Sequence, residues 1–308
     1  MTHSSILATI DVGSNAIRLL IARVNEHLDV HVLYKTREAI RLGQDVFDSG
    51  SISPENFERA KKAFVKFHEQ IKKHGVEKYQ AVGTSALREA NNQDQFIRTI
   101  KDASGIQIEV IDGQREGQLI YSAITHKLDL NTKTCLLMDI GGGSVELTMV
   151  DHGQFISTQS FPAGTVRLLQ MKNKVLDGDR QLNQVLGQVF PPMDAFIQKH
   201  IKQFKPDVAI GTGGNFETLG KLRISVLHKT SIYSLSTEDL EKLNEILFAM
   251  TFKERVQLLK LREDRADVIL PAAKLTLKVM KAAQTEILKI PYIGLKEGLI
   301  YDLASRLQ

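Results

Sequence analysis

The hydrophobic pattern of this chain contains the same unit twice: an apolar run, an acidic residue, a turn of small residues and a second apolar run. In residues 135–150 the acid is Asp139 and the turn contains three consecutive glycines. This pattern predicts strands at 134–139 and 145–150 joined as a hairpin. Residues 5–22 repeat it around Asp11. Repetition about one domain length apart predicts two similar domains, each offering a loop to a shared cleft.

The small residues of these turns point to an anion site. Consecutive glycines let backbone N–H groups approach a ligand closely, and clustered N–H groups bind anions such as phosphate. Asp139 and Glu146 flank the second turn, and carboxylates beside phosphate suggest Mg²⁺, which prefers oxygen ligands. An Asp-Gly hairpin without any ligand is the alternative for a single turn, and the second copy weighs against it.

The rest of the pattern alternates strands with helices, as in an α/β protein. Ser53 and Pro54 begin a helix as N-cap and first helical residue. Two further expectations are a small-residue loop at 84–88, before a helix near Asn91, and a glycine loop at 211–215. Pro191-Pro192 should break or kink the helical pattern of 180–202. The other predicted strands are 30–36, 80–83, 106–111, 155–160, 207–210 and 286–290, and the other helices 114–126, 237–250, 252–261, 264–283 and 295–307.

Composition narrows the class of protein. The 308 residues are 43% hydrophobic and 25% charged, which is ordinary for a soluble protein with two domains. No apolar run approaches the ~20 residues of a membrane span, and the first residues do not resemble a signal peptide. With Cys135 as the single cysteine, we expect a cytoplasmic protein whose cysteine serves packing. The net charge of +4 suits a polyanionic substrate, and nucleic acid is not expected because basic-aromatic clusters and zinc spacings are lacking.

The paired turns resemble the actin/sugar kinase/Hsp70-like superfamily. The chain more specifically resembles the exopolyphosphatase/guanosine pentaphosphate phosphatase (Ppx/GppA) family in its short two-domain form, over essentially its whole length. The motifs that carry this resemblance occur in the family's order and are Asp11-Val12-Gly13-Ser14-Asn15, Gly83-Thr84-Ser85-Ala86-Leu87-Arg88, Ile111-Asp112-Gly113-Gln114-Arg115-Glu116-Gly117, Asp139-Ile140-Gly141-Gly142-Gly143-Ser144-Val145-Glu146, Gly164-Thr165-Val166-Arg167-Leu168, Gly211-Thr212-Gly213-Gly214, Arg265-Ala266-Asp267-Val268-Ile269 and Gly294-Leu295-Lys296-Glu297-Gly298.

This resemblance implies an α/β fold of two actin-like (ribonuclease H-like) domains around a central cleft, at 1–124 and 125–308. The closing helix, about 296–307, is expected to pack back on the first domain. The implied activity is release of terminal orthophosphate from inorganic polyphosphate, from the 5′ end of guanosine pentaphosphate, or from both. No membrane partner is expected, and a homodimer is a candidate assembly.

The resemblance also assigns residues to roles. Glu116 is the expected general base, although a glutamate in the first turn of a helix also simply complements the helix dipole. Arg265 is expected near the phosphate chain, with a structural salt bridge as its alternative. Asp139 and Glu146, with Asp11 as a further candidate, would hold Mg²⁺ or Mn²⁺. The expected substrate-binding residues are Ser14, Asn15, Arg18, Ser85, Arg88, Gly141, Gly142, Gly143, Ser144, Gly213, Gly214 and Arg265.

Two other functions remain open at this point. An ATP-dependent small-molecule kinase of the same fold would use the same phosphate loops, and a non-catalytic alarmone or nucleotide sensor could retain them. Glu116 and the Gly-Thr-Ser-Ala-Leu-Arg segment favour hydrolysis. Three residues depart from the family pattern and leave their local contacts undecided: Arg115, Asn215 and Lys296.

Overall fold

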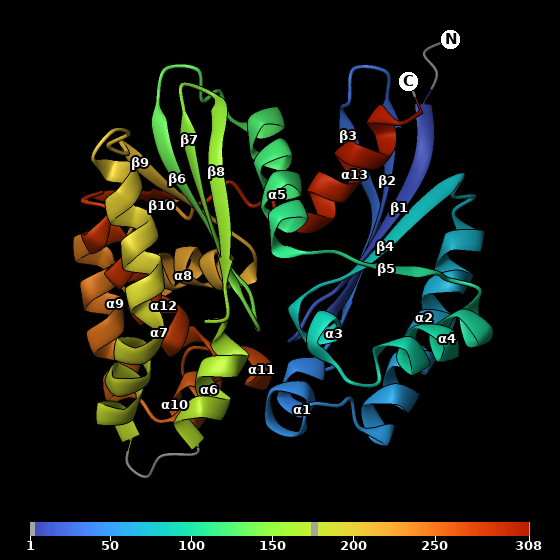
Figure 1. The fold of residues 1–308 in the computed structure, drawn as a ribbon, viewed down its shortest axis with the longest axis horizontal. Coiled ribbons are helices and arrows are strands. Elements are labelled where there is room, and N and C mark those ends of the chain that lie inside the picture. Colours follow the sequence, from blue (N-terminus) through green and yellow to red (C-terminus); the bar gives the residue numbers. More distant parts are fainter. Residues whose placement is uncertain (1–3, 174–177, 308) are drawn as a thin grey trace. The chain divides into compact units, whose positions relative to one another are not determined.

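The computed structural model describes residues 4–173 and 178–307, and it has a mixed α/β fold with two sheets (Figure 1). Its described residues form two compact units. The first comprises the chain up to Ala123 together with the segment from Leu295, and the second is Ile124–Gly294. Residues 1–3, considered above for a signal peptide, lie outside the described residues. No helix of the described part is long and apolar enough to cross a membrane.

The first unit is built on a five-stranded sheet in the order β3-β2-β1-β4-β5. The first three strands are antiparallel neighbours, as the hairpin pattern predicts, and β4 and β5 join in parallel on the other side of β1. The strands are β1 Ser4–Val12, β2 Ile17–Asn25, β3 Val30–Glu38, β4 Lys78–Gly83 and β5 Ile108–Val110.

Apolar side chains of β1 and β2 point alternately to the two faces of the sheet, and both faces are buried at these strands. Ile10 and Val12 lie in one core with residues of α2 (Pro54–Lys73) and α4 (Gln93–Ser104). Leu7 and Leu20 lie in a separate core with the closing helix α13 (Leu295–Ser305). The other helices of this unit are α1 Leu42–Ser49, α3 Ser85–Glu89 and α5 Gly113–Lys127, whose last residues cross into the second unit.

The second unit has a six-stranded sheet in the order β10-β11-β9-β6-β7-β8. The hairpin β6–β7 continues antiparallel to β8, while β9 lies parallel to β6. The strands are β6 Thr134–Ile140, β7 Val145–Asp151, β8 Gln154–Phe161, β9 Val208–Thr212, β10 Ser234–Ser236 and β11 Ile287–Lys289.

One large core joins this sheet to its helices. The core contains Leu136, Met138 and Ile140 of β6 together with Leu182 of α7 and Leu275 of α12. The alternate positions of β6 therefore lie on the opposite face of the sheet. The helices are α6 Thr165–Asn173, α7 Gly178–Ile201, α8 Gly214–Ser225, α9 Thr237–Ala249, α10 Phe252–Gln257, α11 Glu263–Ala266 and α12 Ile269–Ala282.

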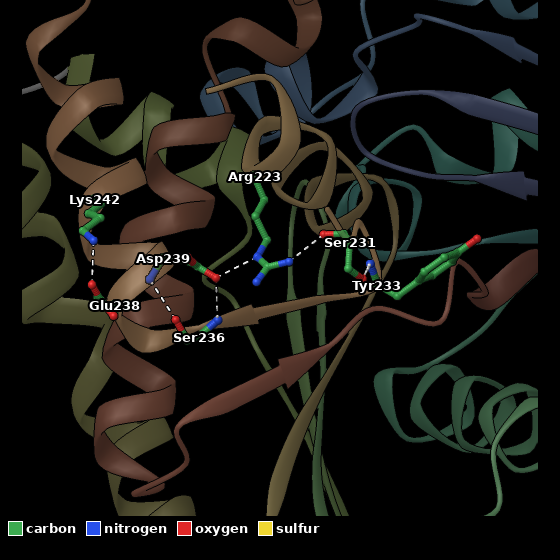
Figure 2. Close-up of polar contacts among 7 residues, drawn as sticks. All are labelled: Arg223, Ser231, Tyr233, Ser236, Glu238, Asp239 and Lys242. Carbon is green, nitrogen blue, oxygen red and sulfur yellow. Dashed lines mark hydrogen bonds and ion pairs between the residues drawn. The ribbon is translucent and has the colours of Figure 1, made fainter. Parts of the chain in front are cut away.

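A partly buried polar network around the buried carboxylate of Asp239 holds the end of α8 to the start of α9 (Figure 2). Arg223 donates to the Asp239 carboxylate over 2.7 Å and to the Ser231 carbonyl over 2.8 Å. Ser236 and Asp239 form a capping box at the first turn of α9. Burial raises the pKa of Asp239, but hydrogen bonds from Arg223 and from the backbone N–H of Ser236 outweigh that effect, and the pKa is lowered.

Several elements differ from the sequence prediction. The helix α7 is continuous through Pro191 and Pro192, so the segment does not break there, and the kink that was the other expectation stays a prediction. Apolar residues on both sides of the prolines, including Leu186 and Met193, are buried in one core, and their packing offsets the ~3 kcal/mol cost of proline inside a helix.

The predicted helix 264–283 is instead divided into α11 and α12. Pro271 explains the division, because its ring conflicts with the carbonyl four residues earlier, at Asp267, if one helix runs through both. Residues 42–49 form the helix α1, which the sequence analysis did not predict and which ends at Gly50 in the left-handed conformation (φ 79°). Residues 85–89 form α3, where a loop was expected, and β10 was not foreseen. Ser53 caps α2 as predicted, accepting from the Asn56 N–H.

Candidate functional site

The two repeated turns have the same length and the same closing hydrogen bond. In each hairpin four residues separate the last paired positions, Val12↔Ile17 in one and Ile140↔Val145 in the other. The first N–H of each loop donates to the fourth carbonyl, over 3.2 Å from Gly13 and 3.0 Å from Gly141. The repeat read from the sequence is therefore also a repeat in structure.

The glycine turn of the second unit is held from one side by the start of α6. The carbonyls of Gly141, Gly142 and Gly143 accept hydrogen bonds from the N–H groups of residues 164–167, over 2.8–3.1 Å. In a trans peptide the N–H points opposite to the carbonyl. The N–H groups of the next three residues, 142–144, therefore point away from α6 and toward one side of the turn. Three adjacent N–H groups in this arrangement can bind a phosphate oxygen.

This contact requires glycine at position 164. A Cβ there would lie 2.4 Å from backbone atoms of Gly142 and Gly143, closer than real Cβ contacts allow. Gly164 thus lets α6 approach the turn closely enough to hold its carbonyls.

Two carboxylates flank the glycine turn on adjacent strands. Asp139 and Glu146 are direct cross-strand partners, and an oxygen of one lies within 4.8 Å of an oxygen of the other. Thr212 donates to Asp139 over 2.9 Å, and Ser160 donates to Glu146 over 2.7 Å. Each carboxylate is thereby oriented by a hydroxyl from a neighbouring strand.

A divalent cation fits this pair of side chains. Two like charges at opposed positions destabilise a sheet when nothing neutralises them. Carboxylate oxygens are the ligands that Mg²⁺ prefers, usually with waters completing its octahedron. The carboxylate oxygens of Asp139 and Glu146 are therefore suited to bind Mg²⁺ beside a phosphate site.

The second glycine loop borders Asp139. Gly213 has φ 88°, and a Cβ there would lie 2.8 Å from an Asp139 carboxylate oxygen. Its left-handed backbone conformation favours glycine, and a side chain there would also displace the Asp139 carboxylate. Gly214 lies against the guanidinium of Arg265, because a Cβ added at this position would lie 2.8 Å from Nη2.

Arg265 is buried and donates to the side chain of Asn215. Asn215 in turn donates to the carbonyl of Ile140 over 2.7 Å. Asn215 thus links Arg265 to the strand that leads into the glycine turn. This hydrogen bond gives Arg265 a structural contact with a neutral side chain, and both expectations for Arg265, the phosphate contact and the salt bridge, stay predictions.

In the first unit the equivalent hairpin has a different charge pattern. Asp11 forms an ion pair of 2.7 Å with Arg18, its cross-strand partner. At the position where the second hairpin has Glu146, this hairpin has a cation, so Asp11 is already neutralised. Between the two repeats, the carboxylate pair of the second is better suited to hold a metal.

The turn of the first hairpin is tied to α3. Ser14 Oγ accepts from the Ala86 N–H over 3.2 Å, and its carbonyl accepts from the Gly43 N–H over 2.9 Å. Asn15 is buried, and Ser85 donates to Glu89 over 3.0 Å. The predicted residues of this turn and of the 84–88 segment thus come together within the first unit.

Arg88 and Glu116 also face each other in this unit, with 4.0 Å between Nη1 and Oε2. Arg88 donates to the Ile111 carbonyl over 2.6 Å, two residues before α5 begins. Glu116 lies in the first turn of α5 and is only 6% exposed. A buried carboxylate beside a partly exposed guanidinium is chemically suited to hold a water near a bound anion.

Three residues that the sequence analysis did not assign also shape the candidate site: Ser160, Gly164 and Thr212. Ser160 is the cross-strand partner of Glu146, which becomes visible only once strand register is known. Thr212 and Gly164 stand inside motifs quoted above, but their contacts to Asp139 and to the glycine turn require the tertiary fold.

Cys135 does not belong to this chemistry. It is fully buried on β6, and burial raises the pKa of its thiol to about 11. It therefore remains protonated near neutral pH and serves packing.

Comparison with known proteins gives consistent matches along the chain. The Ppx/GppA phosphatase family matches residues 20–307. Exopolyphosphatase 2 of Mycobacterium tuberculosis is 27% identical over 97% of this chain and 98% of its own length. The guanosine-5′-triphosphate,3′-diphosphate pyrophosphatase of Vibrio parahaemolyticus is 26% identical over 99% of this chain and 60% of its own length. A solved exopolyphosphatase from Cytophaga hutchinsonii superposes with a TM-score of 0.89, at 31% identity over 99% of both chains.

Proposed function

This chain belongs to the Ppx/GppA phosphatase family, and we propose that it hydrolyses phosphoanhydride bonds. It would release terminal orthophosphate from inorganic polyphosphate, from the 5′ end of guanosine pentaphosphate, or from both. The names of the exopolyphosphatase and pyrophosphatase relatives support these two substrate classes. Its two actin-like domains are the fold of this family.

The glycine turn beside Asp139 and Glu146 carries the proposal. Its directed N–H groups suit a phosphate, and the two oriented carboxylates suit Mg²⁺. Phosphoanhydride hydrolysis mainly needs neutralised charge on the transferring phosphoryl group and an aligned water. Mg²⁺ bound at this pair would neutralise phosphate charge.

The side chains of the first unit supply the other requirements. Arg88 would bind a phosphate oxygen as a charge-assisted donor. Glu116 would accept a proton from the attacking water as general base. Arg18, whose charge is shared with Asp11 at 2.7 Å, would contribute a further hydrogen-bond donor to phosphate oxygens. Assigning Glu116 and the carboxylate pair to one reaction rests on the family resemblance.

A phosphate-release assay tests the proposal. The purified chain is incubated with Mg²⁺ and either polyphosphate, guanosine pentaphosphate, or ATP with a panel of sugars. Release of orthophosphate from the first two substrates without an acceptor is the expected result. Phosphate transfer only in the presence of a sugar would favour a kinase, and binding of guanosine pentaphosphate without turnover would favour a sensor.

A further inference from the structure

An ion pair joins the first turn of α5 to the closing helix α13. Arg115 Nη2 lies 2.7 Å from Asp302 Oδ1. The other carboxylate oxygen of Asp302 lies 2.5 Å from Arg306, one turn further along α13. All three residues belong to the first unit, and Arg115 directly precedes Glu116 in the chain.

The helix α13 is a fixed support for this contact. Ile300 and Leu303 pack against Leu7 and Leu20 of the sheet. Thr9 of β1 donates to the Lys296 carbonyl over 2.9 Å at the start of the helix. Asp302 is therefore anchored to the same strands that carry the Asp11–Arg18 hairpin.

The helix α5 touches α13 at a second point. A Cβ on Gly298 would lie 2.2 Å from the Leu119 carbonyl oxygen, so the two backbones are in direct contact there. Leu119 and Arg115 are four residues apart and share one face of α5. Further along α5, the side chains of Leu119, Ile120 and Ala123 are buried and hold the helix in place. The ion pair adds a restraint at the first turn, where Glu116 lies.

Rotation of α5 would move Glu116. Adjacent residues project about 100° apart around a helix, so Arg115 faces α13 while Glu116 faces Arg88 at 4.0 Å. We propose that the Arg115–Asp302 ion pair positions the Glu116 carboxylate by fixing the orientation of the first turn of α5. Arg115 is thus a positioning residue, and this inference rests on the proposed role of Glu116 in hydrolysis.

A simple stabilising ion pair is the competing explanation, and the two are separable. The side chain of Arg115 is 38% exposed, and pairs of this kind contribute little to the free energy of unfolding. A positioning role therefore predicts lost turnover with nearly unchanged thermal stability. Arg306→Ala is the matched control, because it removes a cation from the same carboxylate without touching α5.

The experiment compares Arg115→Met with Arg306→Ala in the full chain. Arg115→Met should lower kcat by about tenfold or more, because small misplacements of a reacting group are costly. Its KM and melting temperature should stay near wild type, and Arg306→Ala should match wild type in all three. A charge swap tests the ion pair directly. In the Arg306→Ala background, Arg115→Glu combined with Asp302→Arg should recover most of the kcat that Arg115→Glu loses without the second substitution.

Equal kcat in Arg115→Met and Arg306→Ala, or failure of the swap to recover activity, would overturn the inference. If the wild type releases no phosphate from any substrate, the proposed function fails separately. Hydrogen exchange then still tests the restraint itself: amides in the first turns of α5 should exchange faster in Arg115→Met than in Arg306→Ala. Identical exchange in the two variants would also overturn it.

Discussion

At the residue scale, two side chains of similar burial have opposite partners. Glu116 lies 4.0 Å from a cation, Arg88, whereas Glu146 faces another carboxylate, Asp139. A nearby cation favours the ionised form of a carboxyl group, and only the ionised form can accept a proton from water. A pair of carboxylates instead favours a bound cation. These surroundings suit Glu116 for proton transfer and Glu146 for metal binding.

Glu116→Gln should therefore separate catalysis from binding. The amide keeps the side-chain shape but cannot accept a proton, so kcat should fall by roughly 10²–10⁴. KM should change little, and the acid limb of the wild-type rate profile should vanish. Glu109→Gln, an exposed carboxylate on β5, is the control and should behave as wild type. Wild-type turnover by Glu116→Gln would leave Glu116 as a helix-start acid that complements the dipole.

Asp139→Asn tests the proposed metal site. The amide oxygen can still accept from Thr212, but one negative charge is lost, so Mg²⁺ affinity and turnover should both fall. Calorimetric titration of Mg²⁺ and rates measured across Mg²⁺ concentrations check this, and excess EDTA should stop the wild type. Asp151→Asn, at the far end of the β6–β7 hairpin, serves as the control. Full wild-type activity in EDTA would exclude the metal.

At the scale of elements, the glycine turn depends on how closely α6 approaches it. The carbonyls of residues 141–143 are held by the first residues of α6, and Gly164 makes that approach possible. The turn therefore has a defined shape before any ligand binds, which reduces the cost of ordering it on binding.

Gly164→Ala should displace the turn. Its Cβ would meet backbone atoms at 2.4 Å, which should cost about 1–3 kcal/mol of unfolding free energy and weaken substrate binding. Gly187→Ala in α7 is the control, because a Cβ there meets no atom within 4 Å and alanine is the better helix former. Urea unfolding and KM for both variants check this, and equal stability of the two would contradict it.

The network of Figure 2 predicts a pH-dependent contribution to stability. Because the pKa of Asp239 is lowered, its stabilisation is present above the unfolded value of about 3.9 and is lost as pH falls through the lower folded value. Arg223→Met should cost about 3 kcal/mol near pH 7, since it removes the cationic partner of a buried carboxylate and leaves it only the Ser236 N–H. The difference from wild type should shrink below about pH 4. Urea unfolding at several pH values measures this, and a pH-independent difference would contradict it.

At the scale of the whole molecule, each unit contains the same hairpin, but the paired side chains beside its turn carry different charges. One repeat ends in the Asp11–Arg18 pair and the other in Asp139 and Glu146. The net charge of +4 is modest, so attraction of a polyanion must depend on local cations such as Arg18 and Arg88.

Affinity for long polyphosphate should therefore fall as salt is added, because the Debye length is only ~10 Å at 0.1 M. Arg88→Ala should weaken binding at low salt and reduce its salt dependence. Arg98→Ala on α4 is a control with the same change of net charge. Unchanged low-salt binding by Arg88→Ala would remove Arg88 from the substrate site.

The sequence by itself determined the α/β fold class and the two hairpins, and the resemblance of its motifs indicated the family. The hairpins and helix starts follow from local signals: apolar alternation, glycine turns and the Ser53 cap depend on residues near one another in the chain. The roles of the site residues remain predictions, whether they are inferred from the sequence or from the structure.

Only the tertiary structure decided the features that depend on contacts between distant residues. Packing on both sides of Pro191-Pro192 preserves α7, which local proline chemistry alone does not predict. The hydroxyls of Ser160 and Thr212 reach the carboxylates through strand register. Arg115 meets Asp302 only because α13 returns to the first sheet. Such contacts are set by burial and register, which a linear pattern does not specify.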